Sequence, residues 1–295
     1  MFWKHLRARW LLAFSPALFA AGSALANEPL EIKIPQRMAI QDYVVPLLEL
    51  ALSKQNRPFN ISFPEGTKNL TGSQVMEKLA DPADTEFNLY AGGTSKAYEK
   101  IAIPIRVPLM RGLLGARIIA IPAGTQPKFA KVRTIRDLQN MTFLQGIGWG
   151  DVAILEGAGL TVETARKDRL YGLLSKYQGD AFPRGAVEIL PEKEQHSDLT
   201  YDIEGEIVLV YDRFPFIFFT GKHDADLAKA ITNGLEAAYA DGSFIRFFRT
   251  HPMIQKAFSV LHLDDRRPIR VENPNLTPEM AAIPTHYWHY FPGIH

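Results

Sequence analysis

Short runs of β-branched and aromatic residues alternate along most of this chain with longer runs whose apolar positions recur every three or four residues. The short runs predict strands, and the longer runs predict amphipathic helices. Residues 41–55 illustrate the second kind, because apolar side chains at 44, 47, 48, 51 and 52 fall on one helical face. Pro46 is compatible with this helix only in its first turn. This alternation is typical of α/β proteins.

The predicted elements form three groups along the chain. The first is a β-α-β-α-β series at 31–34, 41–55, 59–63, a helix capped by Thr71 or Ser73, and 87–90. The second is an α/β series at 117–121, 135–140, 141–145, 151–157, 162–164, 168–177 and 180–182. The third has strands at 207–211 and 214–220, a helix at 224–239 and a short helix at 244–248.

Residues 191–206 predict loops, and the proline-rich last thirty residues predict an extended surface tail. The first group predicts a doubly wound sheet, whose ligands bind at the carboxyl ends of the strands.

Composition narrows the class of protein. The 295 residues are 46% hydrophobic and 22% charged, which excludes a disordered, collagen-like or multi-span membrane chain. Cysteine is absent, so a disulfide framework, a thiolate metal site and a cysteine nucleophile are excluded. A net charge of +1 disfavours nucleic acid as a partner.

The amino terminus predicts export. A basic start with Lys4, Arg7 and Arg9 precedes an apolar run over 11–21, which is too short to cross a bilayer as a helix. Ala24-Leu25-Ala26 fits the small-x-small rule for signal peptidase, so cleavage is expected after Ala26. The alternative is an uncleaved anchor. A cysteine-free exported chain suits a periplasm, which does not oblige a large domain to carry disulfides.

The sequence offers no motif for a catalytic centre or a bound cofactor. It contains no G-x-S-x-G, H-E-x-x-H or P-loop pattern. Gly148, Gly150 and Ala153, with Asp168 further on, meet a loose dinucleotide fingerprint, but that acid opens a predicted helix instead of closing a strand. His286, His289 and His295 lie in a proline-flanked tail without a neighbouring acid, which disfavours a metal site. We therefore expect no cofactor and no metal.

The glycine-rich loop at 146–150 is a candidate ligand site. Gly148 lets the backbone approach a ligand closely, and the helix that follows presents free amide donors, which favour anions. Trp149 either lies against a ligand or fills a gap between loop and sheet. Asp151 is predicted first to be the N-cap of this helix and second to contact a ligand.

Three arginines are candidates for binding an anion. Arg184 follows the predicted strand 180–182, where two parallel hydrogen bonds to a carboxylate or phosphate are possible. Its alternative is a surface pair with Glu188, one helical turn on. Arg106 and Arg111 lie where the chain crosses between its first two groups, and each either binds ligand or stabilises a hinge.

The order of these groups resembles the periplasmic solute-binding proteins of the type II fold, and within them the family 3 proteins that serve amino-acid transporters. The resemblance covers nearly all of 29–265. It is carried by Ile135-Arg136-Asp137-Leu138, Gly179-Asp180-Ala181-Phe182, Leu227-Ala228 and Asp241-Gly242-Ser243-Phe244.

The resemblance implies a fold and a set of domains. The fold is two doubly wound α/β lobes joined by two hinge crossings, near 106–111 and 204–211. The domains implied are a signal peptide at 1–26, a discontinuous lobe I at 27–108 and 207–295, and an inserted lobe II at 109–206.

The sequence departs from the amino-acid binders at the ligand positions. Their first lobe usually carries Thr-x-x-Arg, whose arginine holds the ligand carboxylate, whereas the stretch from Gly93 to Lys100 has Thr94 but no arginine. Gly93 and Thr94 remain candidate contacts in this stretch. Their second lobe usually supplies an aspartate where this chain has Arg184. A positive charge in place of a negative one predicts an anionic or strongly hydrogen-bonding ligand.

The function implied by the resemblance is closure of two lobes over a small polar ligand, followed by delivery to the membrane permease of an ABC transporter. A membrane sensor protein is the alternative partner. A dehydratase-like enzyme on this fold is the third possible function. Such an enzyme requires an acid or base in the cleft, for which Tyr43, Asp151 and Glu188 are the candidates. Tyr43 is also a candidate ligand contact. A periplasmic monomer is expected.

Overall fold

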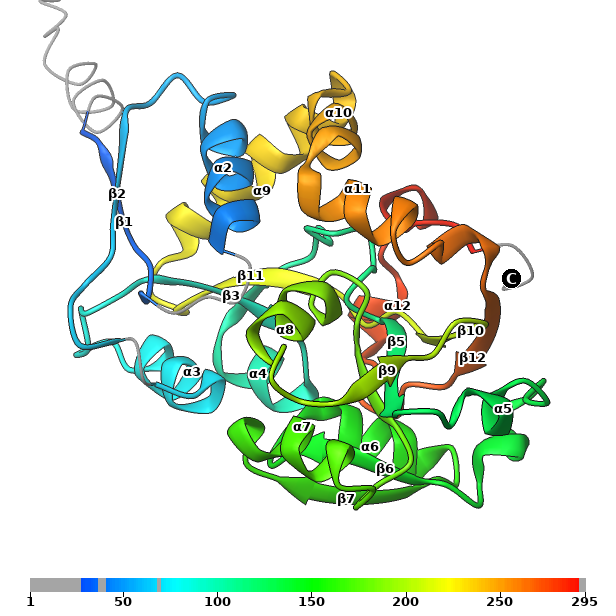
Figure 1. Ribbon diagram of the computed structural model, residues 1–295. Coiled ribbons are helices and arrows are strands. Elements are labelled where there is room, and N and C mark those ends of the chain that lie inside the picture. Colours follow the sequence, from blue (N-terminus) through cyan, green and yellow to red (C-terminus); the bar gives the residue numbers. More distant parts are fainter. Residues whose placement is uncertain (1–27, 37–40, 68–69, 292–295) are drawn as a thin grey trace, which may run out of the picture.

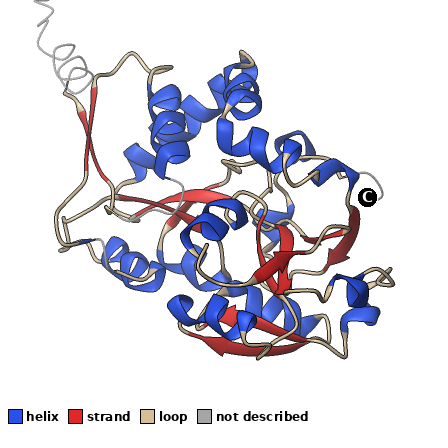
Figure 2. Cartoon of the chain, viewed as in Figure 1, coloured by secondary structure: helices blue, strands red, loops and turns tan. Residues whose placement is uncertain are grey.

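The computed structural model describes residues 28–36, 41–67 and 70–291, and shows a mixed α/β chain whose helices flank several small sheets (Figures 1 and 2). The predicted signal peptide at 1–26 and His295 lie outside the described residues. Among the described residues, no helix combines the length and the apolarity needed to cross a membrane.

The first two strands pair in parallel around a helix. Strands β1 (Leu30–Lys33) and β2 (Phe59–Ser62) are joined through helix α2 (Gln41–Leu52). Pro46 lies beyond the first turn of α2, contrary to the expectation from sequence. Its missing N–H frees the carbonyl of Asp42, and the His251 ring nitrogen Nε2 lies 3.3 Å from that oxygen. A long-range contact thus compensates for the proline.

The next sheet carries one side of the candidate site. Its order is β3 (Leu89–Gly93), β11 (Phe216–Thr220) and β4 (Ile103–Ile105), with both neighbours antiparallel to β11. Helix α3 (Gly72–Ala80) packs on β3, and α4 (Lys96–Ile101) follows it. The strand predicted at 87–90 in fact extends through Gly92 and Gly93, because both glycines pair with β11.

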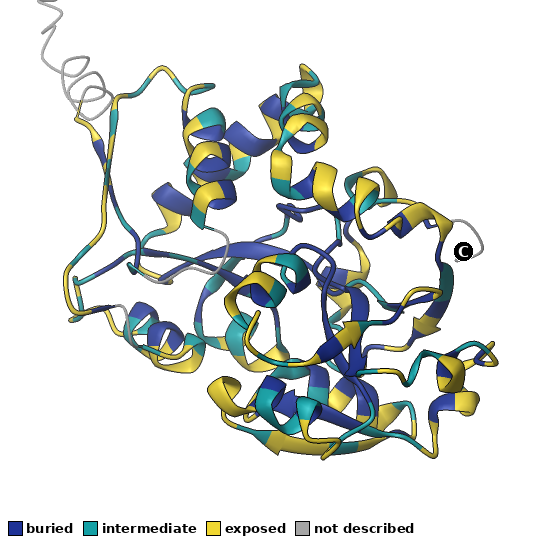
Figure 3. Cartoon of the chain, in the orientation of Figure 1, coloured by how far each residue is buried: buried dark blue, intermediate teal, exposed yellow. Residues whose placement is uncertain are grey.

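The largest sheet is built on a completely buried strand, β5 (Ala116–Pro122) (Figure 3). Its order is β12 (Arg267–Val271), β10 (Ile207–Tyr211), β5 and β8 (Phe182–Gly185), and β9 (Tyr201–Ile203) also pairs with β5.

The expectation that Arg184 stands in a strand-to-helix turn is wrong, because it pairs with Ile118 inside β8. β8 is the last strand in this sheet's order, and a parallel bridge between Phe143 and Ala181 places the segment of Phe143 on its other side. Residues 191–206 are also more regular than expected. They contain most of α8 (Ile189–Gln195) and all of β9.

A smaller parallel pair follows the predicted α/β series. Strand β6 (Thr142–Gly146) pairs with β7 (Thr161–Ala165) through α6 (Gly150–Gly157), and α7 (Lys167–Ser175) comes next. The short predicted helix at 135–140 is a 3-10 turn, Ile135–Leu138, and α5 (Gln126–Phe129) precedes it.

The carboxyl-terminal part is helical before it becomes extended. Helices α9 (Ala225–Ala240) and α10 (Ser243–Thr250) match the predicted ones. Helix α11 (Pro252–Ser259) was not predicted, although Pro252 at its first position and the His251 side chain at its N-cap are the expected start signals.

The tail contains more regular structure than the extended path predicted for it. It holds β12, α12 (Pro278–Ala281) and a 3-10 turn at Thr285–Tyr287, and another 3-10 turn, Leu263–Asp265, precedes it.

Candidate functional site

A cleft of about 690 Å³ lies where three distant parts of the chain meet. One side is formed by 70–73 and by 90–98 without Lys96, all of them uncharged, and is called the neutral wall below. The other side, called the charged wall, is formed by 147–151 with Lys167, Arg184 and Glu188. The remaining lining residues are Leu114, Arg117, Phe214 and Phe216.

Phe214 lies between the two walls. A Cβ added at Gly93 of the neutral wall would meet the Phe214 ring at 3.1 Å, and one added at Gly150 of the charged wall would meet it at 3.6 Å. Phe214 is itself 5% exposed. The ring therefore limits how closely the walls approach each other at this point.

The neutral wall is shaped by capped helix starts and by aromatic rings. Thr71, one of the two caps that the sequence predicted, caps α3 through a capping box with Gln74. The hydroxyls of Ser73 and Tyr98 lie 3.2 Å apart. The Tyr90 ring lies so close to Gly92 that a Cβ there would meet it at 2.6 Å. Burial, with the nearby Tyr98, raises the pKa of Tyr90 to about 12, so its phenol remains neutral.

The charged wall is held by ion pairs under its surface. Arg184 makes two hydrogen bonds to Glu192 of α8, from Nε to Oε2 at 2.6 Å and from Nη2 to Oε1 at 2.8 Å. Its Nη2 also lies 3.2 Å from Glu188, and its guanidinium carbon lies 4.7 Å from the centre of the Trp149 ring.

Burial alone would raise the pKa of Glu192, but the hydrogen bonds and charge of Arg184 outweigh it and hold that pKa below its ordinary range. Arg184 thus lines the cleft, but its guanidinium is already engaged by Glu192 and Glu188 and stacked on Trp149.

Arg117 on β5 is the second buried arginine at the cleft. Its Nη2 lies 2.8 Å from Asp151 and its Nη1 3.4 Å from Glu188, while its Nε has no hydrogen-bond partner among the described residues. Burial raises the pKa of the Asp151 carboxyl, and the charge of Arg117 opposes this shift. Burial together with Asp151 also raises the pKa of Tyr211.

Sequence reasoning missed Arg117. The available signal was a lone arginine in the otherwise apolar strand 116–122.

The structure brings six of the nine predicted ligand contacts to this cleft, namely Gly93, Thr94, Gly148, Trp149, Asp151 and Arg184. Tyr43, Arg106 and Arg111 are not among the lining residues. Tyr43 is completely buried and donates to the carbonyl of Leu109 at 2.7 Å.

The two arginines that do not line the cleft have structural partners. Arg106 pairs with Glu99 at 3.4 Å. Arg111, whose φ is +53°, donates to the carbonyls of His286 and Trp288 in the tail.

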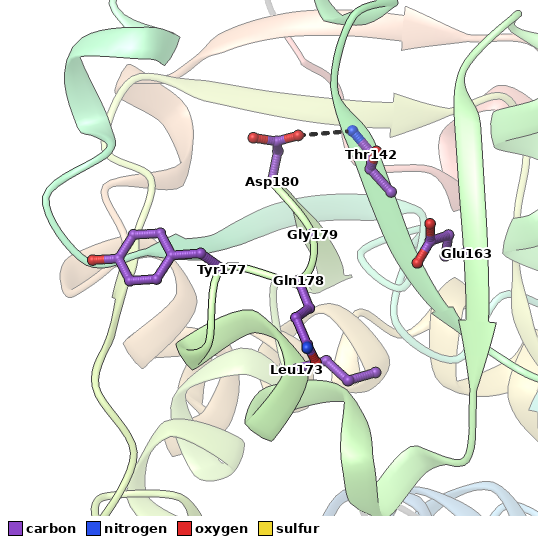
Figure 4. A pocket seen from close by; sticks show the side chains of 7 residues that line it. All are labelled: Thr142, Glu163, Leu173, Tyr177, Gln178, Gly179 and Asp180. Atoms are coloured by element: carbon purple, nitrogen blue, oxygen red, sulfur yellow. Dashed lines mark hydrogen bonds between the residues drawn. The ribbon is translucent and has the colours of Figure 1, made fainter.

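A second, smaller depression lies at the start of β6 (Figure 4). Its volume is about 470 Å³. Asp180, the acid drawn at its top, accepts from the backbone N–H of Thr142 at 3.0 Å and pairs with Lys128 at 3.2 Å. This acid is already satisfied by the protein, so the depression is a weaker candidate than the cleft.

The described residues hold no group of three or more histidine, aspartate or glutamate side chains placed to bind one metal ion. In the tail, the ring of His289 lies 3.3 Å from Asp264, and burial lowers the pKa of this histidine.

Comparison with known proteins identifies the fold. No family model matches the sequence, and no curated protein matches it. Among solved structures, a probable amino-acid ABC transporter extracellular-binding protein of Bacillus subtilis is similar, at 13% identity, a TM-score of 0.54, and coverage of 75% of this chain and 96% of that one. An arginine transport-system periplasmic binding protein of Legionella pneumophila is similar at 14% identity, TM-score 0.52, covering 75% and 98%. An arginine-specific periplasmic binding protein of Salmonella typhimurium is similar at 11% identity, TM-score 0.51, covering 75% and 98%.

The class that these neighbours define is the periplasmic binding fold of type II. This chain has that fold, which confirms the fold expected from the sequence resemblance. The neighbours are matched over almost their whole length, whereas about a quarter of this chain lies outside each match.

Proposed function

We propose that this protein is an exported solute-binding protein that closes the neutral and charged walls over a small polar ligand. The observation that carries this proposal is the cleft itself, which brings two walls from distant parts of the chain around the buried guanidinium of Arg117. A buried donor without a protein partner, such as Arg117 Nε, costs free energy unless a ligand or water accepts from it. The fold shared with transport-associated binding proteins supports the same role.

The ligand proposed for this cleft carries an anionic group. The side chains lining it include three cations, Arg117, Lys167 and Arg184, against two acids, Asp151 and Glu188. Helices α3 and α6 both begin at the cleft, and helix amino termini favour anions. Arg184 makes two hydrogen bonds to Glu192, whereas Lys167 lies 3.4 Å from Glu192 with half of its side chain exposed and Arg117 Nε has no hydrogen-bond partner among the described residues. Arg117 and Lys167 are therefore the cations proposed to meet the ligand. Amino acids are included among the ligands to test, because two of the similar solved structures are an arginine-specific periplasmic binding protein and a periplasmic binding protein of an arginine transport system.

Binding is proposed in preference to catalysis. Of the three acid or base candidates, Tyr43 is outside the cleft, and Asp151 and Glu188 each lie against a guanidinium. Both carboxylates therefore already have a cationic partner within the protein. Closure would follow from contacts that the ligand makes with both walls only in the closed state. The lobe boundaries at 108/109 and 206/207, the cleavage after Ala26, and delivery to an ABC permease are part of the same proposal.

Trp149 supplies a direct test, because residues 27–295 contain only two tryptophans, Trp149 at the cleft and Trp288 in the tail. A thermal-shift screen of this protein against amino acids, organic anions, phosphates and sugars comes first. A ligand at a hundred times its dissociation constant adds about 2.7 kcal/mol, or roughly 5–10 °C for a protein of this size.

Hits are then titrated into Trp288→Phe, in which Trp149 is the remaining fluorophore, with Trp149→Phe as the matched control. A saturable change in Trp288→Phe that is absent from Trp149→Phe supports binding at the cleft. A hit that leaves the emission of both variants unchanged places its ligand elsewhere and contradicts the proposed site.

A further inference from the structure

The segment between β12 and α12 contacts the charged wall directly and the neutral wall through residues of α4. Residues 273–277, called the strap below, run from the sheet of β12 toward α12, where the chain turns from orange to red in Figure 1. On the charged wall, Asn275 Nδ2 donates to the carbonyl of Gly150 at 3.4 Å. On the α4 side, Lys96 Nζ donates to the carbonyl of Pro274 at 2.8 Å, and Thr277 Oγ1 donates to Glu99 Oε2 at 2.9 Å.

These contacts reach the lining of the cleft in one or two steps. Gly150, whose carbonyl accepts from Asn275, is itself a lining residue and the first residue of α6. Glu99, which is 6% exposed, accepts from the hydroxyl of Thr94 through its other oxygen at 3.0 Å. Thr94 lines the neutral wall. The strap therefore connects a group on each wall without entering the cleft.

The strap is anchored at both ends and has internal order. Before it, β12 pairs in parallel with β10 over five residues. After it, Met280 of α12 is completely buried in the hydrophobic cluster beneath α3. Within it, the buried Asn273 accepts from the backbone N–H of Asn275 at 3.0 Å. A segment of five residues spans at most about 17 Å when fully extended, so its length limits how far its two ends can separate.

We propose that Asn275 and Thr277 are positioning residues that set the separation of the two walls and limit how far the cleft opens. The proposal rests on the proposed function, because it assumes that the walls move when ligand enters and leaves. Opening requires Gly150 to move away from Glu99 and Lys96, and the strap is hydrogen-bonded to all three. Removing the side-chain hydrogen bonds of Asn275 and Thr277 releases the walls while leaving every lining side chain in place.

The test measures the wall separation directly. The chain has no cysteine, so Glu77→Cys on α3 and Glu156→Cys on α6, both at exposed positions, give two unique sites for a fluorophore pair. Single-molecule energy transfer between them is recorded without ligand in the otherwise unaltered protein, in Asn275→Ala, in Thr277→Val and in the double variant. Thr277→Ser keeps the hydroxyl, and Thr285→Val makes the same change at an exposed tail position with no side-chain hydrogen bond to either wall.

The expected result is a longer mean separation and a broader distribution in Asn275→Ala and Thr277→Val, most of all in the double variant. Thr277→Ser and Thr285→Val should match the parent. For whichever small molecule passes the tryptophan test above, affinity should fall by about 3- to 10-fold in the double variant, since a smaller fraction of molecules is in the binding-competent arrangement.

Two outcomes separate the inference from the function on which it rests. If the double variant has the parent's distribution while its melting temperature shows that it is folded, the strap does not position the walls. If no small molecule binds the parent at the cleft, the proposed function fails, while the distance comparison still decides whether the strap restrains the walls. Equal broadening in Thr285→Val would show general loosening of the tail and overturn the specific role of Thr277.

Discussion

The two walls of the cleft are built by different forces. The neutral wall takes its shape from hydroxyl hydrogen bonds, glycines and tyrosine rings, as at Tyr90 over Gly92. The charged wall takes its shape from guanidinium groups that acids hold beneath it, as at Arg184. A neutral hydrogen bond contributes about 1 kcal/mol, whereas breaking one partner from a buried ion pair costs several times as much. Single substitutions in the charged wall should therefore lower the stability of the protein more than those in the neutral wall.

The largest effect is expected when Glu192 is removed from under the charged wall. Glu192→Ala leaves the guanidinium of Arg184, which is 4% exposed, without its two-point partner. We expect a loss of about 3–5 kcal/mol of unfolding free energy, measured by urea denaturation. The matched change on the neutral wall is Tyr98→Phe, which removes the contact with Ser73 and should cost about 1 kcal/mol or less. Similar losses in the two variants would contradict the contrast between the walls.

The lowered pKa of Glu192 also predicts how the stability of the protein depends on pH. The folded pKa of Glu192 is lowered to about 2 from an ordinary value of 4.5. A lowered carboxyl pKa contributes stability that is complete above the unfolded pKa and is lost as the pH falls through the folded pKa. In Glu192→Gln, unfolding free energy should therefore fall less steeply than in the parent between pH 4.5 and about 2. Parallel pH profiles of the two proteins would show that Arg184 does not depend on the charge of Glu192.

The contrast between the walls also separates what the sequence could predict from what it could not. The cap of α3 was narrowed to Thr71 or Ser73 because capping depends on a few adjacent residues, and Thr71 proves to be the cap. The loop at 146–150 was predicted to line a ligand site because glycines after a strand are a local signal. The type II fold was likewise predictable from the order of elements.

The ion pairs were not predictable, because they depend on tertiary packing. Arg184 meets Glu192 only because 182–185 is a strand and α8 returns over it. Arg117 sits in an apolar strand, and nothing in that strand's pattern shows that this one side chain faces the cleft. Tyr43 was predicted to contact ligand, but its ring packs against Phe247 and His251. The pattern of its helix does not show which residues pack against it.

A third prediction concerns Trp149, the aromatic side chain of the charged wall. A Cβ added at Gly146 would overlap the Trp149 ring, so Gly146→Ala must displace it from Arg184. We expect a loss of about 1–3 kcal/mol and a shifted Trp149 emission in the Trp288→Phe background.

Gly148→Ala is the control for this prediction. A Cβ at Gly148 meets nothing within 4 Å, but φ is +76°, so about 1 kcal/mol of backbone strain is expected without displacement of the ring. Identical emission spectra in the two alanine variants would show that Trp149 is not seated against Gly146.

The smallest effect is expected at the start of α3, on the neutral wall. Thr71→Ala removes the hydroxyl that accepts from the backbone N–H of Gln74 and should cost about 1 kcal/mol, while Thr71→Ser should retain most of it. Helix α6 on the charged wall has Trp149 at its N-cap and no side-chain cap, and among its first amides that of Val152 donates to the carbonyl of Trp149. If the ligand uses α6 and not α3, Thr71→Ala lowers the melting temperature equally with and without ligand. A ligand-induced shift that shrinks in Thr71→Ala but not in Thr71→Ser would instead assign the anionic group to the start of α3.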